Sequence, residues 1–600
     1  RESGVRPNKI TLIAMLCICS TYDMLVLGEW LHSLIVDLDL DLDDVALCNA
    51  LLTMYGKCGN EVEAQKVFDE ISNRNMYSWS GLISAYANKG MVEKAIELCI
   101  ETRERDNNRP DKLAFIAVLR EISEKKDMGL ARKAHREITT CGLALDLTVG
   151  NALIDMYGKC GDLALANEVF RQLPEQNAGS WNALIGGYAI QNGREKEVFD
   201  IFENMLKQRI EADEDVYVTI LQVCGKIKDA ERASYFHSHI IGNGYECDLV
   251  VGNALIKMYA EMENLQQCFI VFNKMYERDI VTWNSMITGL VAQGHDNDAI
   301  FLYEQMQEEG VITDAHTLVY ALQASANLVG KEDVDVKSNS EQKDESEIGK
   351  ALHAYARRKG FTSTNVFVVN TIIGMYGKCG AIAEAEMVFS SLFQPDVVSY
   401  NAMLSSYINK QQGEMALLLF REMQENGIAP TELTFVIILQ ACAILSLEED
   451  RLCQQIKEEM SVSLEIGKAL HIDVERKGFM SDIVVGSSVM NMYAKCGGMF
   501  EAKKLFGIFS NSSIVPWNTI LSAYIRDGQP EEALTLLRKA QKQHAIFDDL
   551  TLTSILQACS LTGNLDICKE IHFGVASSCY EEIPSLATTL IYAYGSCGGV

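Results

Sequence analysis

One phrase returns at a nearly constant interval along this chain. It reads N-A-L-(I/L)-x-M-Y-G-K-C-G and begins at Asn49, Asn151, Asn253, Asn370, Ser487 and Thr588, in altered form from the third copy on, with spacings of 102, 102, 117, 117 and 101 residues. A second phrase, S-W-N-A-(L/M)-I, keeps the same register at Trp79, Trp181, Trp283, Trp517 and, where tryptophan is missing, Tyr400. Two markers in one register predict a stack of equivalent units, not the roughly four independent domains that this length would otherwise suggest.

Each period divides into three helical hairpins of about 31, 35 and 35 residues, because apolar residues return every three or four positions on both sides of a glycine-containing turn. In residues 280–314 the turn falls at 293–296, and the apolar stripes are Trp283, Met286, Ile287 and Leu290, then Ala299, Leu302, Tyr303 and Met306. Neither helix is long enough to be stable alone in water, so the hairpins must stack. The predicted fold is all-α, a right-handed superhelical solenoid of helix-turn-helix repeats.

Composition excludes several other classes of protein. Apolar residues make up 48% of the chain, yet no run approaches the roughly 18 that a membrane-spanning helix needs. The 18 cysteines include no C-x-x-C pair, which favours a reducing compartment and argues against a zinc site. Five cysteines recur in the GKC, KCG or SCG phrases and are predicted to be packing residues: Cys58, Cys160, Cys379, Cys496 and Cys597.

Six histidines fall at one late place in the middle hairpin of each period, after phrases such as GKALH. They are His32, His135, His237, His353, His471 and His572. A position repeated six times predicts packing or hydrogen bonding between helices, not six metal sites. We expect neither a metal nor another cofactor.

The two 117-residue periods contain about sixteen extra residues each, inside the middle hairpin. The first insertion, 331–346, is polar and charged, which predicts a disordered surface loop. The second, near 447–465, places Leu452, Ile456 and Met460 four residues apart on one helical face. It predicts a simple helix extension or, as the alternative, a small partner-binding helix.

The hairpin lengths, the phrases NALIDMYGKCG, SWNALI and GKALH, and endings such as YERD (276–279) make the chain resemble the plant-type PLS subclass of pentatricopeptide repeat proteins. The resemblance covers residues 9–600, and residues 1–8 look like the tail of a preceding P hairpin. On this pattern the hairpins are L 9–44, S 45–75, P 76–111, L 112–146, S 147–177, P 178–213, L 214–248, S 249–279, P 280–314, L 315–365, S 366–396, P 397–431, L 432–482, S 483–513, P 514–548, L 549–583 and a truncated S 584–600. Both ends therefore fall within hairpins, and no targeting segment is expected in this sequence.

The resemblance implies that the first helices bind single-stranded RNA, with one base read by two residues of each hairpin. The first of the two lies early in the first helix: Asn49, Ser80, Asn151, Asn182, Asn253, Asn284, Asn370, Asn401, Ser487 and Asn518. The second is the last residue of the hairpin, in the same order Asn75, Asp111, Asn177, Asp213, Asp279, Asp314, Asp396, Thr431, Ser513 and Asp548. The family's behaviour implies uracil for Asn with Asp, either pyrimidine for Asn with Asn, and guanine for Ser with Asp.

The residue types suit base recognition independently of the family. An asparagine amide offers a donor and an acceptor to a base edge, whereas a carboxylate only accepts. The alternative is that Asn and Asp merely cap helices, which explains Asp before a helix but not Asn inside one. The L hairpins depart from the pattern, with Ile13, Ile116, Val218, Val319, Val436 and Thr553 at the first position, so they are expected to be spacers or weak readers.

The predicted function is sequence-specific binding of single-stranded, uridine-rich RNA, as an adaptor in the editing, processing or stabilisation of organelle transcripts. The role, the organelle (chloroplast or mitochondrion) and protein partners in an editing or processing complex are implied by the resemblance alone. The formal charge of −29 opposes RNA binding, because phosphates attract basic surfaces. It favours the alternative, a protein-binding helical-repeat scaffold with an acidic surface. A neutral or basic groove would decide for RNA.

No enzymatic activity is expected from this chain. It has no GxxxxGK[ST] loop, HExxH helix or GxSxG elbow. The H-R-E triplet at 135–137 matches part of the zinc-deaminase signature, but no P-C-x-x-C follows and the histidine recurs in every period without its glutamate. We expect no small-molecule substrate and no membrane partner.

Overall fold

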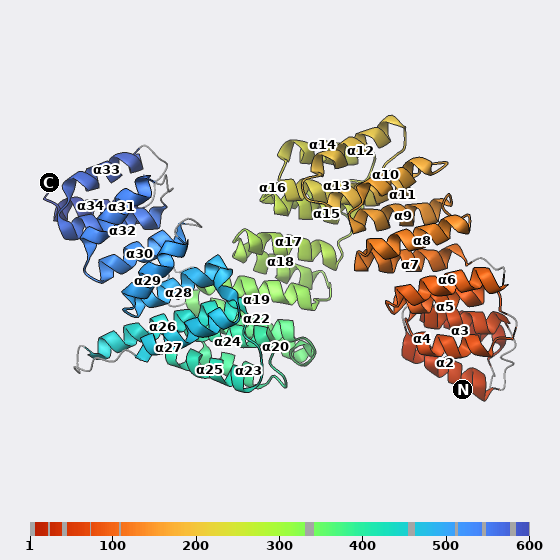
Figure 1. Cartoon of the computed structure of the whole chain (residues 1–600), viewed down its shortest axis with the longest axis horizontal. Helices are drawn as coiled ribbons and strands as arrows, with labels where there is room; N and C mark the ends of the chain where they lie inside the picture. Colours follow the sequence, from red (N-terminus) through yellow and green to blue (C-terminus); the bar gives the residue numbers. More distant parts are fainter. Residues whose placement is uncertain are drawn as a thin grey trace. The chain divides into compact units, whose positions relative to one another are not determined.

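The computed structural model describes residues 7–598 apart from 22–23, 39–44, 73, 107–109, 331–340, 454–461, 510–513, 543–547 and 577–583. All regular elements in these residues are helices, which pair into hairpins in chain order (Figure 1). Every described helix is too short or too polar to span a bilayer. The chain forms two compact units, residues 1–289 and 290–600, and the division falls within α17 (Ile280–Ala292).

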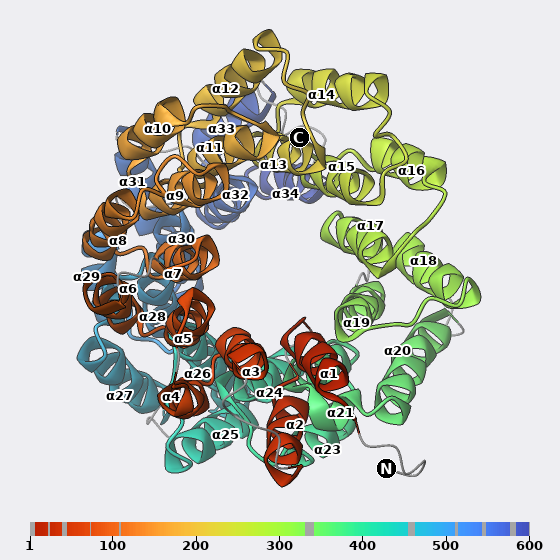
Figure 2. The same ribbon diagram turned by 90° about the vertical axis from the view of Figure 1, so that its right-hand side faces the viewer.

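In the first unit the first helices of successive hairpins pack on one another as a first-helix layer. These helices are α1 (Lys9–Thr21), α3 (Val45–Lys57), α5 (Met76–Asn88), α7 (Lys112–Lys125), α9 (Leu147–Cys160), α11 (Ala178–Ile190), α13 (Glu214–Ile227) and α15 (Leu249–Glu261). The second helices flank them as a second-helix layer, which Figure 2 shows for α10 to α16. They are α2 (Leu25–Asp37), α4 (Glu61–Glu70), α6 (Val92–Asp106), α8 (Met128–Thr140), α10 (Leu163–Gln172), α12 (Glu195–Lys207), α14 (Ala230–Gly242) and α16 (Leu265–Lys274).

The second unit repeats this arrangement. Its first helices are α19 (Ala315–Gly330), α22 (Val366–Lys378), α24 (Val397–Asn409), α26 (Glu432–Cys453), α28 (Ile483–Lys495), α30 (Val515–Arg526), α32 (Asp549–Thr562) and α34 (Pro584–Ser596). Its second helices are α18 (Asp296–Glu308), α20 (Glu341–Arg358), α23 (Ile382–Ser390), α25 (Gly413–Glu425), α27 (Val462–Arg476), α29 (Met499–Phe509), α31 (Pro530–Lys542) and α33 (Leu565–Ala576). Two short elements, α21 (Phe361–Thr364) and η1 (Phe479–Ser481), join helices.

The repeated aromatic residues form the core between hairpins. Trp181 lies on Phe170 of the preceding second helix with ring centroids 4.8 Å apart and planes at 76°. Tyr400 makes the same contact with Phe389 at 5.1 Å, so it replaces tryptophan structurally as well as in the sequence. Such edge-on pairs add about 0.5–1.5 kcal/mol to the area that they bury.

Neighbouring first helices approach most closely at glycine. A Cβ atom added to Gly158 of α9 would lie only 2.5 Å from the Cα atom of Gly187 in α11. The two backbones can therefore touch only because neither residue has a side chain. Helix α9 ends at Gly161, whose φ of +92° suits glycine, and its N–H donates to the last turn of the helix.

The six recurring histidines each hydrogen-bond a tyrosine, as the sequence predicts for this position. Nδ1 lies 2.8–3.0 Å from the hydroxyl in the pairs His32–Tyr55, His135–Tyr157, His237–Tyr259, His353–Tyr376, His471–Tyr493 and His572–Tyr594. Each pair joins the second helix of one hairpin to the first helix of the next. Burial lowers the pKa of His135 and raises that of Tyr157 to about 12, so both groups are neutral at pH 7.

The described parts of the two insertions are helical. Helix α20 begins at Glu341, so the predicted loop is wrong for residues 341–346, while 331–340 lie outside the described residues. Good helix formers precede the buried stripe there, so the helix extends towards its N-terminus. Helix α26 continues to Cys453 and α27 begins at Val462, as a helix extension predicts. Ile456 and Met460 lie outside the described residues.

Candidate nucleic-acid interface

The predicted first-position residues all lie early in the first helices of their hairpins, in α17 for Asn284 and in the first-helix layer for the others. Each is the fifth residue of its helix, except Asn518, which is the fourth residue of α30. Because the helices pack in sequence, these side chains recur once per hairpin within each unit.

The predicted last residues cap the following first helix. The side chain of each of the nine described ones accepts a backbone N–H from the first turn of that helix: Asn75, Asp111, Asn177, Asp213, Asp279, Asp314, Asp396, Thr431 and Asp548. Ser513 lies outside the described residues. Capping, the alternative to base reading, is therefore a real role of these side chains.

The structure also brings many of the predicted pairs into contact. The amide Nδ2 of the first residue donates to Oδ1 of the last at 2.9–3.5 Å in Asn49–Asn75, Asn151–Asn177, Asn253–Asp279, Asn370–Asp396 and Asn518–Asp548, which also uses Oδ2. In the Ser80–Asp111 pair the backbone N–H of Asp111 donates to Ser80 Oγ at 3.0 Å. Capping and pairing are thus performed by one side chain.

Three pairs differ from this arrangement. Asn401 and Thr431 are linked through Thr434, whose hydroxyl lies 2.8 Å from Asn401 Oδ1 and 3.1 Å from Thr431 Oγ1. Asn182 Oδ1 instead accepts from Thr219 Oγ1 of the next L hairpin at 3.2 Å. Asn284 and Asp314 belong to different units.

A buried hydroxyl residue that the sequence analysis missed contacts the capping residue of these pairs and, at Asn49, Asn151, Asn401 and Asn518, the first residue as well. It is the third residue of the following helix: Ser78, Ser180, Thr282, Thr317, Ser399, Thr434 and Thr551. Ser78 Oγ lies 2.7 Å from Asn49 Oδ1 and 3.1 Å from Asn75 Oδ1, so it fixes which end of the Asn49 amide faces Asn75. The available signal was the capping-box spacing, Asn/Asp/Thr-x-x-Ser/Thr, at each hairpin junction.

Three of the capping carboxylates, Asp279, Asp396 and Asp548, remain ionised. Burial opposes ionisation of Asp279, but hydrogen bonds from the Thr282 backbone and hydroxyl and from Asn253 outweigh it and lower the pKa of Asp279. The pKa of Asp396 and that of Asp548 are lowered in the same way. These side chains therefore only accept hydrogen bonds. Oδ1 of Asn253 and of Asn370 is buried and has no partner among the described residues.

An exposed apolar side chain precedes six of the predicted readers and recurs at the same place in four L hairpins, and it too was missed. It is the second residue of the first helix, 48–76% exposed: Ile10, Tyr77, Leu113, Val250, Val281, Phe367, Val398, Leu433, Val484 and Leu550. Residues three apart share a helix face, so it lies one turn before the predicted reader. The apolar stripe of each helix accounts only for its buried apolar residues. An apolar residue outside that stripe was therefore the signal in the sequence for an exposed contact residue.

The negative charge of the chain lies mostly outside this layer. The first helices of the S and P hairpins contain two carboxylates, Asp155 and Glu261. They contain the bases Lys57, Lys159, Lys257, Lys378, Lys495 and Arg526, all in their later turns. By contrast, α12 of the second-helix layer alone contains Glu195, Glu197, Asp200 and Glu203. The first helices of the S and P hairpins are therefore neutral to basic, whereas the capping carboxylates and acidic residues of the L first helices, such as Glu214 and Asp215 of α13, add negative charge to the layer.

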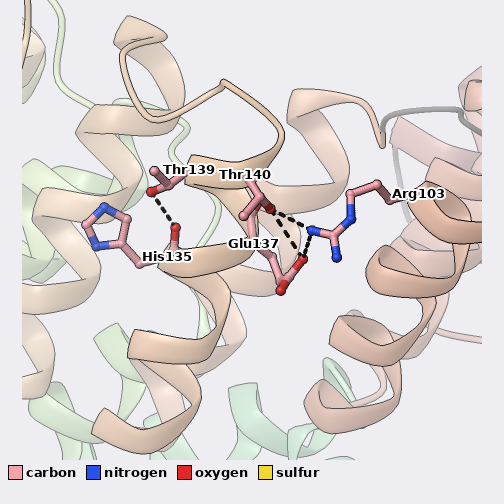
Figure 3. A network of polar contacts seen from close by, with 5 residues as sticks. All are labelled: Arg103, His135, Glu137, Thr139 and Thr140. Atoms are coloured by element: carbon pink, nitrogen blue, oxygen red, sulfur yellow. Dashed lines mark hydrogen bonds and ion pairs between the residues drawn. The ribbon is translucent and has the colours of Figure 1, made fainter.

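The H-R-E triplet is divided between two unrelated contacts. Figure 3 shows the His135 ring pointing away from the Glu137 carboxylate. His135 bonds Tyr157, while Glu137 Oε2 accepts from Nη1 of Arg103 in α6 at 2.7 Å, and the same Nη1 donates to Thr140 Oγ1 at 2.7 Å. Among the described residues no group of three His, Cys, Asp or Glu side chains could hold a metal ion.

Known families contain the same repeat. The PPR repeat family profile matches residues 278–327 and 395–444. The PPR repeat profile matches residues 46–76, 77–107, 151–177, 179–210, 253–280, 367–394, 487–510 and 515–543. The chain belongs to the pentatricopeptide repeat family.

Relatives and solved structures agree with this membership. A mitochondrial pentatricopeptide repeat-containing protein of Arabidopsis thaliana is 29% identical over 100% of this chain and 61% of its own length. A chloroplastic one from the same plant is 30% identical over 77% of this chain and 55% of its own length. This chain thus spans little more than half of these relatives.

The fold is that of solved pentatricopeptide proteins. The crystal structure of PPR10 from maize covers 99% of this chain and 92% of its own, with a TM-score of 0.50 and 18% identity. PPR10 in complex with an 18-nt psaJ RNA element covers 99% and 86%, with a TM-score of 0.57 and 16% identity.

Proposed function

We propose that this chain binds single-stranded RNA in a sequence-specific manner through its first-helix layer, reading about one base per S or P hairpin. The observation that carries the proposal is the recurring contact between the fifth residue of a first helix and the residue that caps the next one. Because this contact fixes the orientation of the amides and carboxylates, they offer directed hydrogen-bond donors and acceptors to successive base edges, one set per S or P hairpin.

The exposed apolar residues supply the second requirement of single-strand binding. An unpaired base has two faces, which gain stability by stacking on apolar or aromatic surface, by about 1–3 kcal/mol per base for aromatic side chains. Phe367 and Tyr77, one turn before Asn370 and Ser80, are placed to contact such a face. Base edges then meet the polar pairs, and a duplex, whose edges are already paired, should bind poorly.

The charge distribution favours RNA over the acidic protein-binding scaffold. The scaffold hypothesis needs a continuous strip of carboxylates along the binding layer. The S and P first helices instead contain mainly bases, in their later turns, and the carboxylates beside them are the capping residues, most of which hydrogen-bond their own helix starts. The lysines in the later turns of these helices can contact phosphates of the RNA backbone. Because these contacts are few, affinity should fall less steeply with salt than for a basic RNA-binding protein.

The proposal extends to subclass, target and location. The three hairpin lengths support the PLS subclass, and relatives named mitochondrial or chloroplastic support an organelle. We propose a role as adaptor in editing, processing or stabilisation of organelle RNA. Writing n for each L hairpin, the expected site is n, pyrimidine, G, n, pyrimidine, U, n, U, U, n, U, pyrimidine, n, undefined, U, n. The undefined place belongs to Ser487 and Ser513, since hydroxyls donate and accept equally.

The test is selection from a random RNA pool with the parent chain and with Asn253→Ser, which leaves Asp279 in place. The variant should move one selected position from uracil towards guanine. Asn264→Ser is the matched control, because Asn264 caps α16 in the same hairpin but belongs to the second-helix layer, and serine can still cap. If the parent enriches no sequence, or both variants select the same word as the parent, base reading by these pairs is refuted.

A further inference from the structure

Helix α20 contains a group of basic side chains around a cavity in the second-helix layer. The cavity has a volume of about 400 Å³ and is lined by Lys350, His353, Ala354, Arg357 and Arg358. This volume falls in the range of small-ligand pockets. Concentrated positive charge is unexpected in a chain with a net charge of −29.

Three cations line this cavity, and the carboxylate of Glu347 lies one helical turn before the first of them, Lys350. Among the described residues, no ion pair involves Lys350, Arg357 or Arg358, and all three side chains belong to exposed residues. His353 is held by its hydrogen bond to Tyr376, 2.9 Å long. Burial lowers the pKa of His353 and Arg357 lowers it further, which reflects a local excess of positive charge.

The equivalent helix of the next L hairpin shows what the same phrase does when it is neutralised. The sequence GKALHAYARRKG of α20 becomes GKALHIDVERKG in α27. There Lys468 pairs with Glu465 at 3.2 Å and Arg476 pairs with Asp473 at 3.8 Å, while the His471 ring, whose pKa is lowered by burial, lies 3.5 Å from Glu475.

Two substitutions between the helices remove carboxylates from α20, whereas Glu347 keeps the place of Glu465. Tyr355 replaces the partner carboxylate Asp473, and Arg357 replaces Glu475. The first removes a negative charge, and the second also adds a positive one. The repeat scaffold itself therefore does not require bare cations here, which makes α20 a local specialisation.

We propose that the α20 cavity is an anion site that binds a phosphate-bearing ligand of about mononucleotide size. Two guanidinium groups and an ammonium group suit the several oxygens of a phosphate, and arginine can engage two of them at once. The His353 ring and the aliphatic stems of Lys350 and Arg357 would contact the remainder of the ligand. The site is separate from the base-reading pairs and does not depend on them.

Calorimetric titration of the full chain in phosphate-free buffer tests this with inorganic pyrophosphate, AMP and adenosine. We expect pyrophosphate and AMP to bind at one site per chain and adenosine, which lacks phosphate, to bind much more weakly. Arg357→Gln and Arg358→Gln should each weaken binding roughly tenfold, the effect of losing one charge-assisted hydrogen bond. Because both residues are exposed, their variants should fold, and circular dichroism checks this.

Matched variants separate a site from general charge. Tyr355→Asp, which reproduces the α27 arrangement, should also weaken binding. Arg476→Gln removes a cation from α27 and should leave binding unchanged. No binding of pyrophosphate or AMP by the parent, equal binding of adenosine and AMP, or equal losses from Arg357→Gln and Arg476→Gln would each overturn the proposal.

Discussion

The buried hydroxyl of Ser180 is the sharpest place to test how the pairs are held. It lies 2.7 Å from Asn151 Oδ1 and 3.0 Å from Asn177 Oδ1. Ser180→Ala keeps the volume of the buried site almost unchanged but removes both contacts. Asn151 Oδ1 then loses its donor, and the Asn177 cap loses its reciprocal hydrogen bond.

The expected loss follows from these contacts. A single intramolecular hydrogen bond contributes about 1 kcal/mol, and a buried group left without a partner costs about 1–3 kcal/mol. Asn151 is only half-buried, so water can replace part of the lost bond. We therefore expect Ser180→Ala to lower the free energy of unfolding by about 1–2 kcal/mol.

RNA recognition should change in a different way. With its orientation no longer fixed, the Asn151 amide can present either end to a base, so selection at that single position should relax while total affinity changes little. Urea denaturation and hydrogen exchange of α9 and α11 measure the first effect, and random-pool selection measures the second.

A matched serine provides the control. Ser238 lies exposed in α14 and donates only to its own helix, to the carbonyl oxygen of Ser234 at 2.9 Å. Ser238→Ala should change neither stability nor selection. If Ser180→Ala costs no more stability than Ser238→Ala, the hydroxyl does not hold the pair and the orientation argument fails.

Three further outcomes are expected. Tyr157→Phe removes the hydroxyl bonded by His135 and should lower the unfolding free energy by about 1 kcal/mol in denaturant titration; an unchanged midpoint would show that the bond adds nothing. Gly158→Val introduces a Cβ atom where the backbone of Gly187 already lies and should cost about 1–3 kcal/mol or more, seen as a lower Tm, whereas full stability would mean that α9 and α11 can separate freely. Five of the recurring histidines have folded pKa values below the ordinary 6.5, so the unfolded chain binds more protons, and Tm should be constant above about pH 7 and fall as the pH drops below 6.5; a Tm that rises from pH 7 to 5.5 would contradict this.

Much of the fold could be predicted because each period repeats the same packing contacts and hydrogen bonds at the same positions. The register of Trp181 and Tyr400 located the contacts between hairpins, and six histidines at one position indicated a structural hydrogen bond. The partner tyrosine could not be chosen from the sequence, since several polar residues follow at comparable distances. The start of α20 was missed because a polar, charged sequence is typical both of a disordered loop and of a helix that extends into solvent.

The arrangement of the candidate site could be predicted in part, and base reading by its residues stays a prediction. The Asn and Asp positions came from the resemblance, and the structure places many of them in contact. The orienting hydroxyls of Ser78 and Thr551 were hidden, because a serine or threonine in a first turn ordinarily reports only a helix start. The exposed Phe367 and Val484 were hidden for the opposite reason, since apolar residues in an amphipathic helix are normally assigned to the core.

The double duty of the capping residues limits how specificity can evolve. The nine described last residues of the S and P hairpins cap the following helix, so their identity is restricted to side chains that accept a hydrogen bond there, and this chain uses only Asn, Asp and Thr at those nine places. Alanine or leucine there would cost about 1 kcal/mol per hairpin. Repeated over many hairpins, such losses would add up along the array. Substitutions among hydrogen-bond-accepting side chains at the capping position can therefore change recognition at little cost in stability. A designer who changes the specificity of the array is limited to the same few residue types.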